Sequence, residues 1–176
     1  VMKIKKTKFK GLVIVKQKNN TDNRGNLRET FNDKFLSKKF IFEYCTTSKK
    51  NVLRGFHFQT RLKQSKFVNV LKGKILDVVV DLRKNSKTFG KKFKIVLSKD
   101  NALGLFIPSG FAHAYYTYEK ENIIYYKLDN YYSPRYESGI IYNDKEVNMK
   151  WPKKRLIISK KDKKLETFSK FKTKFK

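Results

Sequence analysis

The order of apolar and polar residues along this chain is mostly that of β-strands. Short runs alternate between apolar and polar side chains or are rich in β-branched and aromatic residues. Turn residues such as Lys72-Gly73 and Lys84-Asn85-Ser86 separate several of the runs. About nine short strands at this spacing favour a sandwich or barrel such as a jelly roll. The predicted strands cover residues 11–16, 40–46, 52–59, 67–71, 74–82, 92–98, 103–107, 111–118 and 122–128.

Helical segments are predicted only near the two termini. We expect a short helical turn near residues 32–37 and a short helical segment over residues 159–165. No internal repeat or linker divides the chain, so we expect one domain over residues 1–176. Within this domain the lysine-rich tail 163–176 is expected to be frayed, although three phenylalanines give it some apolar content.

The composition is that of a folded domain without disulfides. The chain has 176 residues, with fifteen phenylalanines and ten tyrosines, which is enough to bury a core. Its one cysteine, Cys45, excludes an internal disulfide and a metal site built from several cysteines. The chain has no apolar run of about eighteen residues, and its first residues lack the apolar region of a signal peptide. We therefore expect a cytoplasmic protein that does not enter a membrane.

The net charge of +28 raises the question of a nucleic-acid partner. Lysine accounts for 36 of the 43 basic residues and arginine for only seven, whereas readers of nucleic acid usually rely on arginine. The lysines are spread along the whole chain, so we do not expect nucleic acid to be the partner. A polyanion-binding β module without enzymatic activity remains an alternative. A positive surface would also steer an anionic small substrate toward the protein.

The two histidines of the chain both lie in apolar, strand-like runs. His57 belongs to the run 52–59, beside Arg54, which could hold an anion. His113 ends the run 105–113. A histidine titrates near neutrality and is a natural general base, so two of them in one small β domain suggest an active site. The alternative interpretation is a core histidine whose ring is hydrogen-bonded to backbone.

Short motifs lie in order at residues 22–29, 53–59, 64–66, 79–90, 107–113, 126–127, 132–137, 151–152 and 159–162. This ordered series covers nearly the whole chain and resembles the dTDP-4-dehydrorhamnose 3,5-epimerase family. The resemblance implies a mostly β fold, a cupin jelly-roll barrel with short helical segments near the termini, and usually a homodimer. It also implies an isomerase that needs no cofactor and acts on a nucleotide-sugar substrate.

The same resemblance assigns four catalytic residues. His57 is the base that removes a proton beside a sugar keto group, and Asp162 orients its ring. Tyr126 is the acid on the opposite face of the sugar, and Lys66, with Arg54, stabilises the enolate oxygen. Without the resemblance, Asp162 would be interpreted as a solvated charge in a lysine cluster. Tyr126 would be interpreted as one more packed aromatic residue.

Further residues are implied to bind the substrate. Arginine suits a diphosphate because its guanidinium pairs with phosphate oxygens, and the chain has no glycine-rich phosphate loop. The position two residues after His57 is Gln59 rather than a histidine, which leaves the ligand set of a metal-binding cupin incomplete. We therefore predict no metal. The implied substrate-binding residues are Arg24 and Glu29 at the nucleotide end, Tyr132 and Glu137 near the base and sugar, and Arg54, Gln59 and His113.

One strand departs from the family pattern. Before the Leu-Arg-Gly motif the family typically has Gln-x-Asn-x-Ser, whereas this chain has Phe42, Tyr44 and Thr46 at those positions. Two amides are thus replaced by aromatic rings, which exchange hydrogen bonds for stacking. A relative that epimerises a single carbon, or that uses another nucleotide sugar, is therefore an alternative to the 3,5-epimerase.

Overall fold

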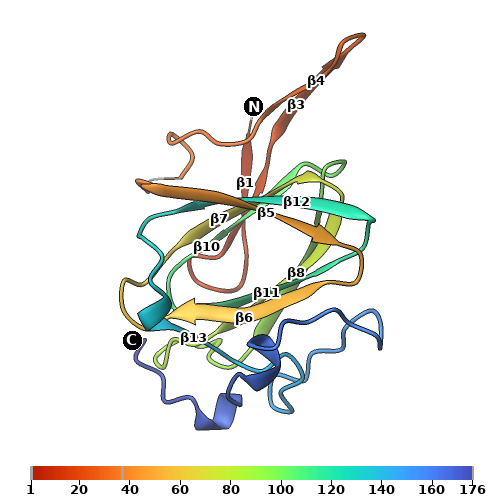
Figure 1. Ribbon diagram of the computed structural model, residues 1–176. Helices are drawn as coiled ribbons and strands as arrows, with labels where there is room; N and C mark the ends of the chain where they lie inside the picture. The colour runs from red at the N-terminus through yellow and green to blue at the C-terminus, as the bar shows by residue number, and fades with distance from the viewer. Residues whose placement is uncertain (1, 37, 176) are drawn as a thin grey trace.

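The structure is a computed structural model that describes residues 2–36 and 38–175. Its strands are β1 (Lys3–Lys6), β2 (Val13–Lys16), β3 (Lys18–Asp22), β4 (Gly25–Glu29), β5 (Phe42–Lys49), β6 (Leu53–Gln59), β7 (Lys66–Lys72), β8 (Lys74–Asp81), β9 (Lys92–Ser98), β10 (Leu103–Ile107), β11 (Phe111–Thr117), β12 (Glu121–Leu128) and β13 (Glu137–Gly139). They form a six-stranded sheet in the order β1-β2-β10-β7-β12-β5 and a five-stranded sheet in the order β13-β6-β11-β8-β9. The two sheets face each other (Figure 1), so the prediction of a mostly β fold is confirmed.

Helical structure among the described residues is limited to three short 3-10 helices. The predicted segment 159–165 contains one of them. Residues 33–35 form the expected turn, in which the Phe35 N–H donates to the carbonyl of Asn32 at 3.2 Å. The remaining predicted residue, Ser37, lies outside the described residues. No helix in the described chain is long and apolar enough to cross a membrane. The three helices are η1 (Pro134–Tyr136), η2 (Asp162–Lys164) and η3 (Phe168–Lys170).

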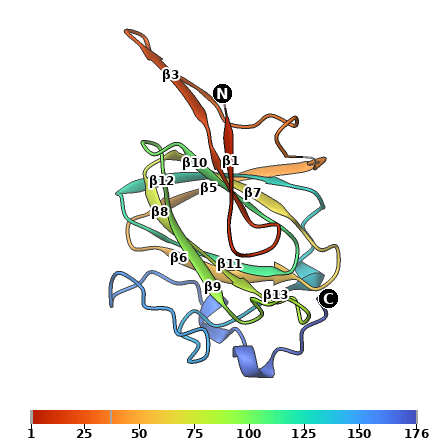
Figure 2. The same cartoon turned by 180° about the vertical axis from the view of Figure 1, so that it is seen from behind.

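Four strands were not predicted: β1, β3, β4 and β13. Strands β3 and β4 pair as a hairpin that projects beyond the sheets (Figures 1 and 2). Every residue of β3 is exposed, so this hairpin has no buried face that would produce an alternating pattern. Strand β13 has only three residues, and its pairing with β6 depends on contacts that are distant in sequence.

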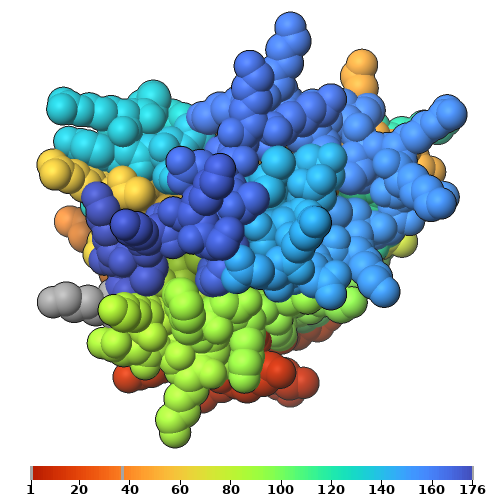
Figure 3. Space-filling view, turned by 90° about the horizontal axis from the view of Figure 1, so that it is seen from below, coloured from red at the N-terminus to blue at the C-terminus, as the bar shows by residue number. Residues whose placement is uncertain are grey.

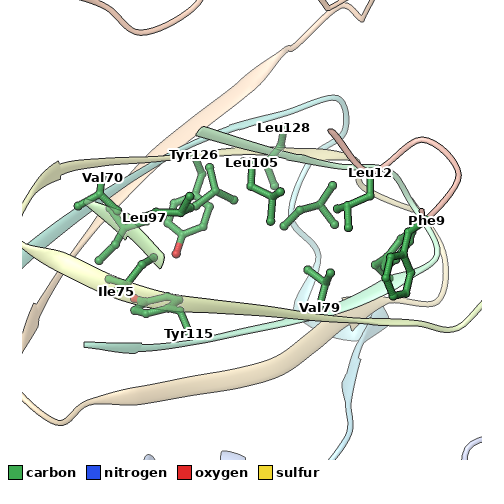
Figure 4. Close-up of a cluster of buried hydrophobic side chains, with 14 residues drawn as sticks. Phe9, Leu12, Val70, Ile75, Val79, Leu97, Leu105, Tyr115, Tyr126 and Leu128 are labelled. Atoms are coloured by element: carbon green, nitrogen blue, oxygen red, sulfur yellow. The ribbon is translucent and has the colours of Figure 1, made fainter. Parts of the chain in front are cut away.

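The main core fills the space between the two sheets. It contains apolar side chains from both sheets together with Phe9 and Leu12 (Figure 4). From β8, Val79 points into this core, whereas Val78 and Val80 belong to a second apolar cluster on the outer face of the five-stranded sheet. Because both faces of β8 are covered, its sequence is a continuous apolar run rather than an alternating one.

The C-terminal segment covers that outer face (Figure 3). The lysine-rich tail was expected to be frayed, yet its described part, residues 163–175, is packed against the sheet. The ring of Phe58 lies 4.8 Å from that of Phe171 and 5.9 Å from that of Phe175, measured between centroids. Phe175 is only 4% exposed. Burial of these rings from water outweighs the flexibility that the neighbouring lysines suggest.

Strand β6 contains a bulge opposite β11. His57 pairs with His113 and Arg54 pairs with Tyr115, so three steps along β6 match two steps along β11. Residues three apart in a regular strand face opposite sides of the sheet. The extra residue in β6 therefore allows Arg54 and His57 to face the same side. Gly55, within the bulge, has a φ of +113°.

We predict that Gly55→Ala destabilises the fold more than Gly25→Ala does. Both glycines have positive φ, so both alanines would be strained, by about 1–3 kcal/mol. A Cβ at Gly55 would also lie 2.5 Å from the carbonyl oxygen of His113, whereas a Cβ at Gly25 meets nothing within 4 Å. Urea unfolding should show an additional loss of about 1–3 kcal/mol for the first variant. Equal losses would contradict the close packing of β6 on β11.

Candidate active site

A pocket of about 360 Å³ lies between the two sheets and takes side chains from both. Strand β5 lines it through alternate residues, because Phe42, Tyr44 and Thr46 face inward while Glu43 and Cys45 are exposed. All eight of the other lining residues carry titratable side chains. The full lining is Phe42, Tyr44, Thr46, Arg54, His57, Lys66, His113, Tyr115, Tyr126, Tyr132 and Glu137.

His57 is held by Asp162, which lies at the start of η2. The His57 Nε2 is 2.8 Å from Asp162 Oδ1, and the backbone N–H of Gly55 donates to Oδ2 at 3.1 Å. Burial favours the protonated carboxyl group, but the hydrogen bonds and the positive charge offered by His57 outweigh it and lower the pKa of Asp162. A carboxylate in this position fixes the ring and leaves Nδ1 for proton exchange.

The second histidine forms a similar pair. His113 Nε2 lies 2.8 Å from Oδ2 of Asp77, a fully buried residue of β8. The ring of His113 meets that of Tyr126 edge-on, with centroids 6.3 Å apart. No group of three or more His, Cys, Asp or Glu residues that could hold a metal ion occurs within residues 2–36 and 38–175.

Tyr126 enters the pocket from β12, in the sheet opposite His57. Its ring stacks on that of Tyr44, with centroids 4.7 Å apart and an interplanar angle of 23°, because the two residues are direct partners in the pairing of β12 with β5. Burial raises the pKa of the Tyr126 phenol well above its usual value, and the neighbouring Tyr115 and Tyr44 raise it further. Tyr126 is therefore a protonated phenol at neutral pH, and it can act as an acid.

Two cationic side chains border the pocket. Lys66, at the start of β7, is half-buried. Burial lowers the pKa of its ammonium group to about 8, against the opposing effect of the carboxylates of Glu137 and Asp77. Arg54 is exposed, and its Nε donates to Ser48 Oγ at 3.2 Å. These two groups supply positive charge to the pocket.

Tyr132 and Glu137, which also line the pocket, form a hydrogen-bonded pair. The Tyr132 hydroxyl donates to Glu137 Oε2 at 2.6 Å, and Lys161 forms an ion pair with the same oxygen. Burial favours the protonated form of Glu137, but these two donors outweigh it and lower the pKa of the carboxyl group. The hydrogen bond to Glu137, together with burial, raises the pKa of Tyr132 to about 12. Tyr132 itself is about half exposed and presents its ring to solvent.

Four of the eleven predicted site residues do not line this pocket, and one of them, Asp162, reaches it through His57. Gln59 is buried, and its amide bonds to Leu62, Tyr131 and Ser133, so it holds the loop that carries Tyr132. The other two residues lie on the projecting hairpin. Arg24 is paired with Asp22 and is largely exposed, and Glu29 accepts a hydrogen bond from Asn32. The remaining eight predicted residues are brought together, seven in the pocket lining and Asp162 through His57.

Sequence analysis missed two residues of the site. Tyr115 is two positions after His113 on β11 and therefore shares its face, so the period of the strand could have identified it. Asp77 is a charged residue inside the apolar run of β8. Such a residue needs a buried partner, and this requirement could have indicated an ion pair with one of the histidines.

Comparisons with known proteins agree with this architecture. A profile of the dTDP-4-dehydrorhamnose 3,5-epimerase family matches residues 6–170. The enzyme of that name from Methanothermobacter thermautotrophicus is 41% identical over 165 residues, which are 89% of either chain. The crystal structure of dTDP-6-deoxy-D-glucose-3,5-epimerase from Legionella pneumophila, in complex with dTDP-4-keto-L-rhamnose, has a TM-score of 0.93 at 34% identity and covers 98% of this chain and 95% of its own.

A second solved structure gives the same result. The dTDP-4-dehydrorhamnose 3,5-epimerase of Bacillus anthracis, with TDP and PPi bound, has a TM-score of 0.91 at 37% identity, over 95% of this chain and 99% of its own. These likenesses confirm the predicted jelly-roll architecture of a cupin-type sugar epimerase. The extent of the match and the identities leave no other assignment: the chain belongs to the dTDP-4-dehydrorhamnose 3,5-epimerase family.

Proposed function

We propose that this isomerase inverts carbons 3 and 5 of dTDP-4-dehydro-6-deoxy-glucose and so produces dTDP-4-dehydro-L-rhamnose. The observation that carries the proposal is the opposition of His57 and Tyr126. His57 projects from β6 in one sheet and Tyr126 from β12 in the other, and both line the same pocket. A sugar ring between them presents one face to a base and the other face to an acid, which is what inversion at a carbon requires.

The reaction then follows from the chemistry of a ketone. The keto group at position 4 acidifies the hydrogens on carbons 3 and 5. His57 accepts one of these protons, and the electrons of the broken C–H bond move to the keto oxygen and form an enolate. Tyr126 gives its proton to the same carbon from the opposite face. Both side chains then exchange protons with water before the second carbon reacts.

Positive charge supports the enolate and the diphosphate. The ammonium group of Lys66 stabilises the enolate oxygen, with Arg54 as a second source of charge. Asp162 stabilises the imidazolium form of His57. Tyr132 and Glu137 hold the nucleotide at the rim, where the ring of Tyr132 can stack on a base. The pocket residues Phe42 and Tyr44 contact the substrate with aromatic surface where the family pattern has amides.

We also propose that two copies of the chain form a homodimer that completes each site. Arg24 and Glu29, predicted to bind the nucleotide, lie on the hairpin that projects away from the sheets, and neither lines the pocket of its own chain. Within one protomer, every residue of β3 in this hairpin is exposed. Docking of this hairpin onto a second copy would bring Arg24 to the pocket of that copy.

Deuterium exchange tests the reaction directly. In deuterated buffer, the unchanged protein should introduce deuterium at both positions 3 and 5 of the substrate, as observed by proton NMR. His57→Ala should reduce the rate at least about 100-fold, because a general base contributes roughly that factor or more. Binding of dTDP, measured by calorimetry, should remain nearly intact. Exchange at only one carbon would contradict the double epimerisation, and full activity in His57→Ala would contradict the role of the base.

The pH dependence of turnover tests Lys66. Its ammonium group, with a pKa lowered to about 8, is charged below that pH and neutral above it. Turnover should therefore fall as the pH rises through about 8, since the enolate loses its cationic partner. Arginine stays charged throughout this range, so any activity retained by Lys66→Arg should not show this fall. The same alkaline fall in Lys66→Arg would assign the titration to another group.

Mixed dimers test the contribution of the hairpin. Arg24→Ala and His57→Ala should each be weakly active alone. Mixing and refolding the two variants should restore activity, because one pocket of the mixed dimer has both His57 and the Arg24 of the other copy. Light scattering should give a mass of about twice 21.0 kDa for each preparation. A failure to restore activity in a verified mixed dimer would show that Arg24 does not serve the other copy.

A further inference from the structure

The hairpin of β3 and β4 projects beyond the sheets (Figures 1 and 2), but Arg28 of β4 ties it back to them. Its Nη2 donates to the carbonyl oxygen of Val70 at 2.7 Å, and its Nη1 donates to that of Lys99 at 3.2 Å. Val70 belongs to β7, whereas Lys99 lies in the turn that follows β9. One guanidinium group therefore joins the hairpin to two separate elements of the main fold.

The two ends of the hairpin are held as well. Gln17 precedes β3 and Thr30 follows β4, and the Nε2 of Gln17 donates to the carbonyl oxygen of Thr30 at 2.8 Å. The same Nε2 donates to Oδ1 of Asn69 in β7, and the backbone N–H of Gln17 donates to the carbonyl of Ala102 at 2.9 Å. Gln17 is only 3% exposed, so water does not compete for these bonds. The hairpin thus begins and ends at fixed points on the main fold.

Arg28 supplies a contact that the two ends alone do not give. Every residue of β3 is exposed, and so are the first three residues of β4. The side chain of Arg24 is 85% exposed and is paired with Asp22 of the same hairpin. A two-stranded hairpin is marginally stable by itself in water, and two fixed ends would act as a hinge about which it could swing. A third point of attachment, away from the hinge, fixes its direction.

The residue type at position 28 suits this attachment. Most basic residues of this chain are lysines, yet an arginine stands here. A guanidinium group is planar and holds its donors in a rigid fork, so it can bond two carbonyls at once in fixed directions. Burial lowers the pKa of the Arg28 guanidinium, which shows that part of its hydration has been given up for these bonds.

We propose that Arg28 is a positioning residue for nucleotide binding, which fixes the direction of the hairpin and so places Arg24 at the pocket of the other copy. The inference rests on the proposed function, in which two copies form a homodimer and each hairpin serves the other pocket. A hairpin that already points in the required direction loses little freedom when the nucleotide binds. Arg24 then meets the diphosphate of the substrate in a prepared orientation.

Steady-state kinetics of Arg28→Gln give the first test. The KM for the nucleotide sugar should rise by about 10- to 100-fold, because hydrogen bonds from a charged group are lost. The kcat should change by less than about threefold, because the residues that act on the sugar are untouched. Lys18→Gln is the matched control: it removes one positive charge from an exposed residue of the same hairpin, and its KM should change by less than about twofold. Arg28→Lys should recover part of the loss, since an ammonium group lacks the fork that bonds both carbonyls.

Mixed dimers separate positioning from a defect of the whole fold. They are assayed at a substrate concentration below the KM of the unchanged protein. Arg28→Gln mixed with His57→Ala should regain activity, because one pocket then has His57 and receives an intact hairpin from the other copy. Arg28→Gln mixed with Arg24→Ala should regain none, because each pocket receives an altered hairpin. A general folding defect in Arg28→Gln would disable its own pocket and prevent recovery with His57→Ala.

The outcomes distinguish this inference from the proposed function. Recovery with His57→Ala but not with Arg24→Ala would support the role of Arg28. An unchanged KM in Arg28→Gln, recovery with Arg24→Ala, or no recovery with His57→Ala would overturn that role. The homodimer would still stand if Arg24→Ala and His57→Ala restore each other. If that pair also fails, the exchange of hairpins is wrong and the role of Arg28 with it, while inversion of both carbons by the unchanged protein would leave the epimerase reaction intact.

Discussion

Strands β6 and β11 lie side by side in the five-stranded sheet, and their bulged pairing decides where the polar side chains of the site point. A regular register would send Arg54 and His57 to opposite faces, one into the pocket and one toward the C-terminal segment. The extra residue at Gly55 places both on the pocket side, next to His113 and Tyr115. The close contact of Gly55 with the backbone of β11 is therefore a condition for the site as well as for the fold.

Each histidine of the pocket has its own buried carboxylate. Asp77 comes from within the five-stranded sheet, whereas Asp162 comes from the segment that wraps around the outside of that sheet. A buried carboxylate is costly unless it is paired, so each aspartate strongly favours one orientation of its histidine ring. The two rings are thus fixed by different parts of the molecule. A disturbance of the C-terminal segment affects His57 and leaves His113 in place.

Much of this arrangement could be predicted from sequence. Alternation and β-branched runs located nine of the strands, and the family resemblance of the motifs at 53–59 and 126–127 identified residues that meet in one pocket. The hairpin of β3 and β4 was not predicted, because it has no buried face. Its residues therefore do not alternate between apolar and polar side chains. Gln59 lies inside a family motif, but only the structure shows that its amide is used by a loop. The packing of the tail could not be predicted, because the tail binds an apolar face of the sheet that is formed by residues distant in sequence.

The hydrogen bond between His57 and Asp162 joins residues that are 105 positions apart. All thirteen strands of the described residues precede Asp162 in the chain, so synthesis completes both sheets' sequence before it adds this carboxylate. A chain that ended before residue 162 would hold every strand of both sheets and lack the partner of His57.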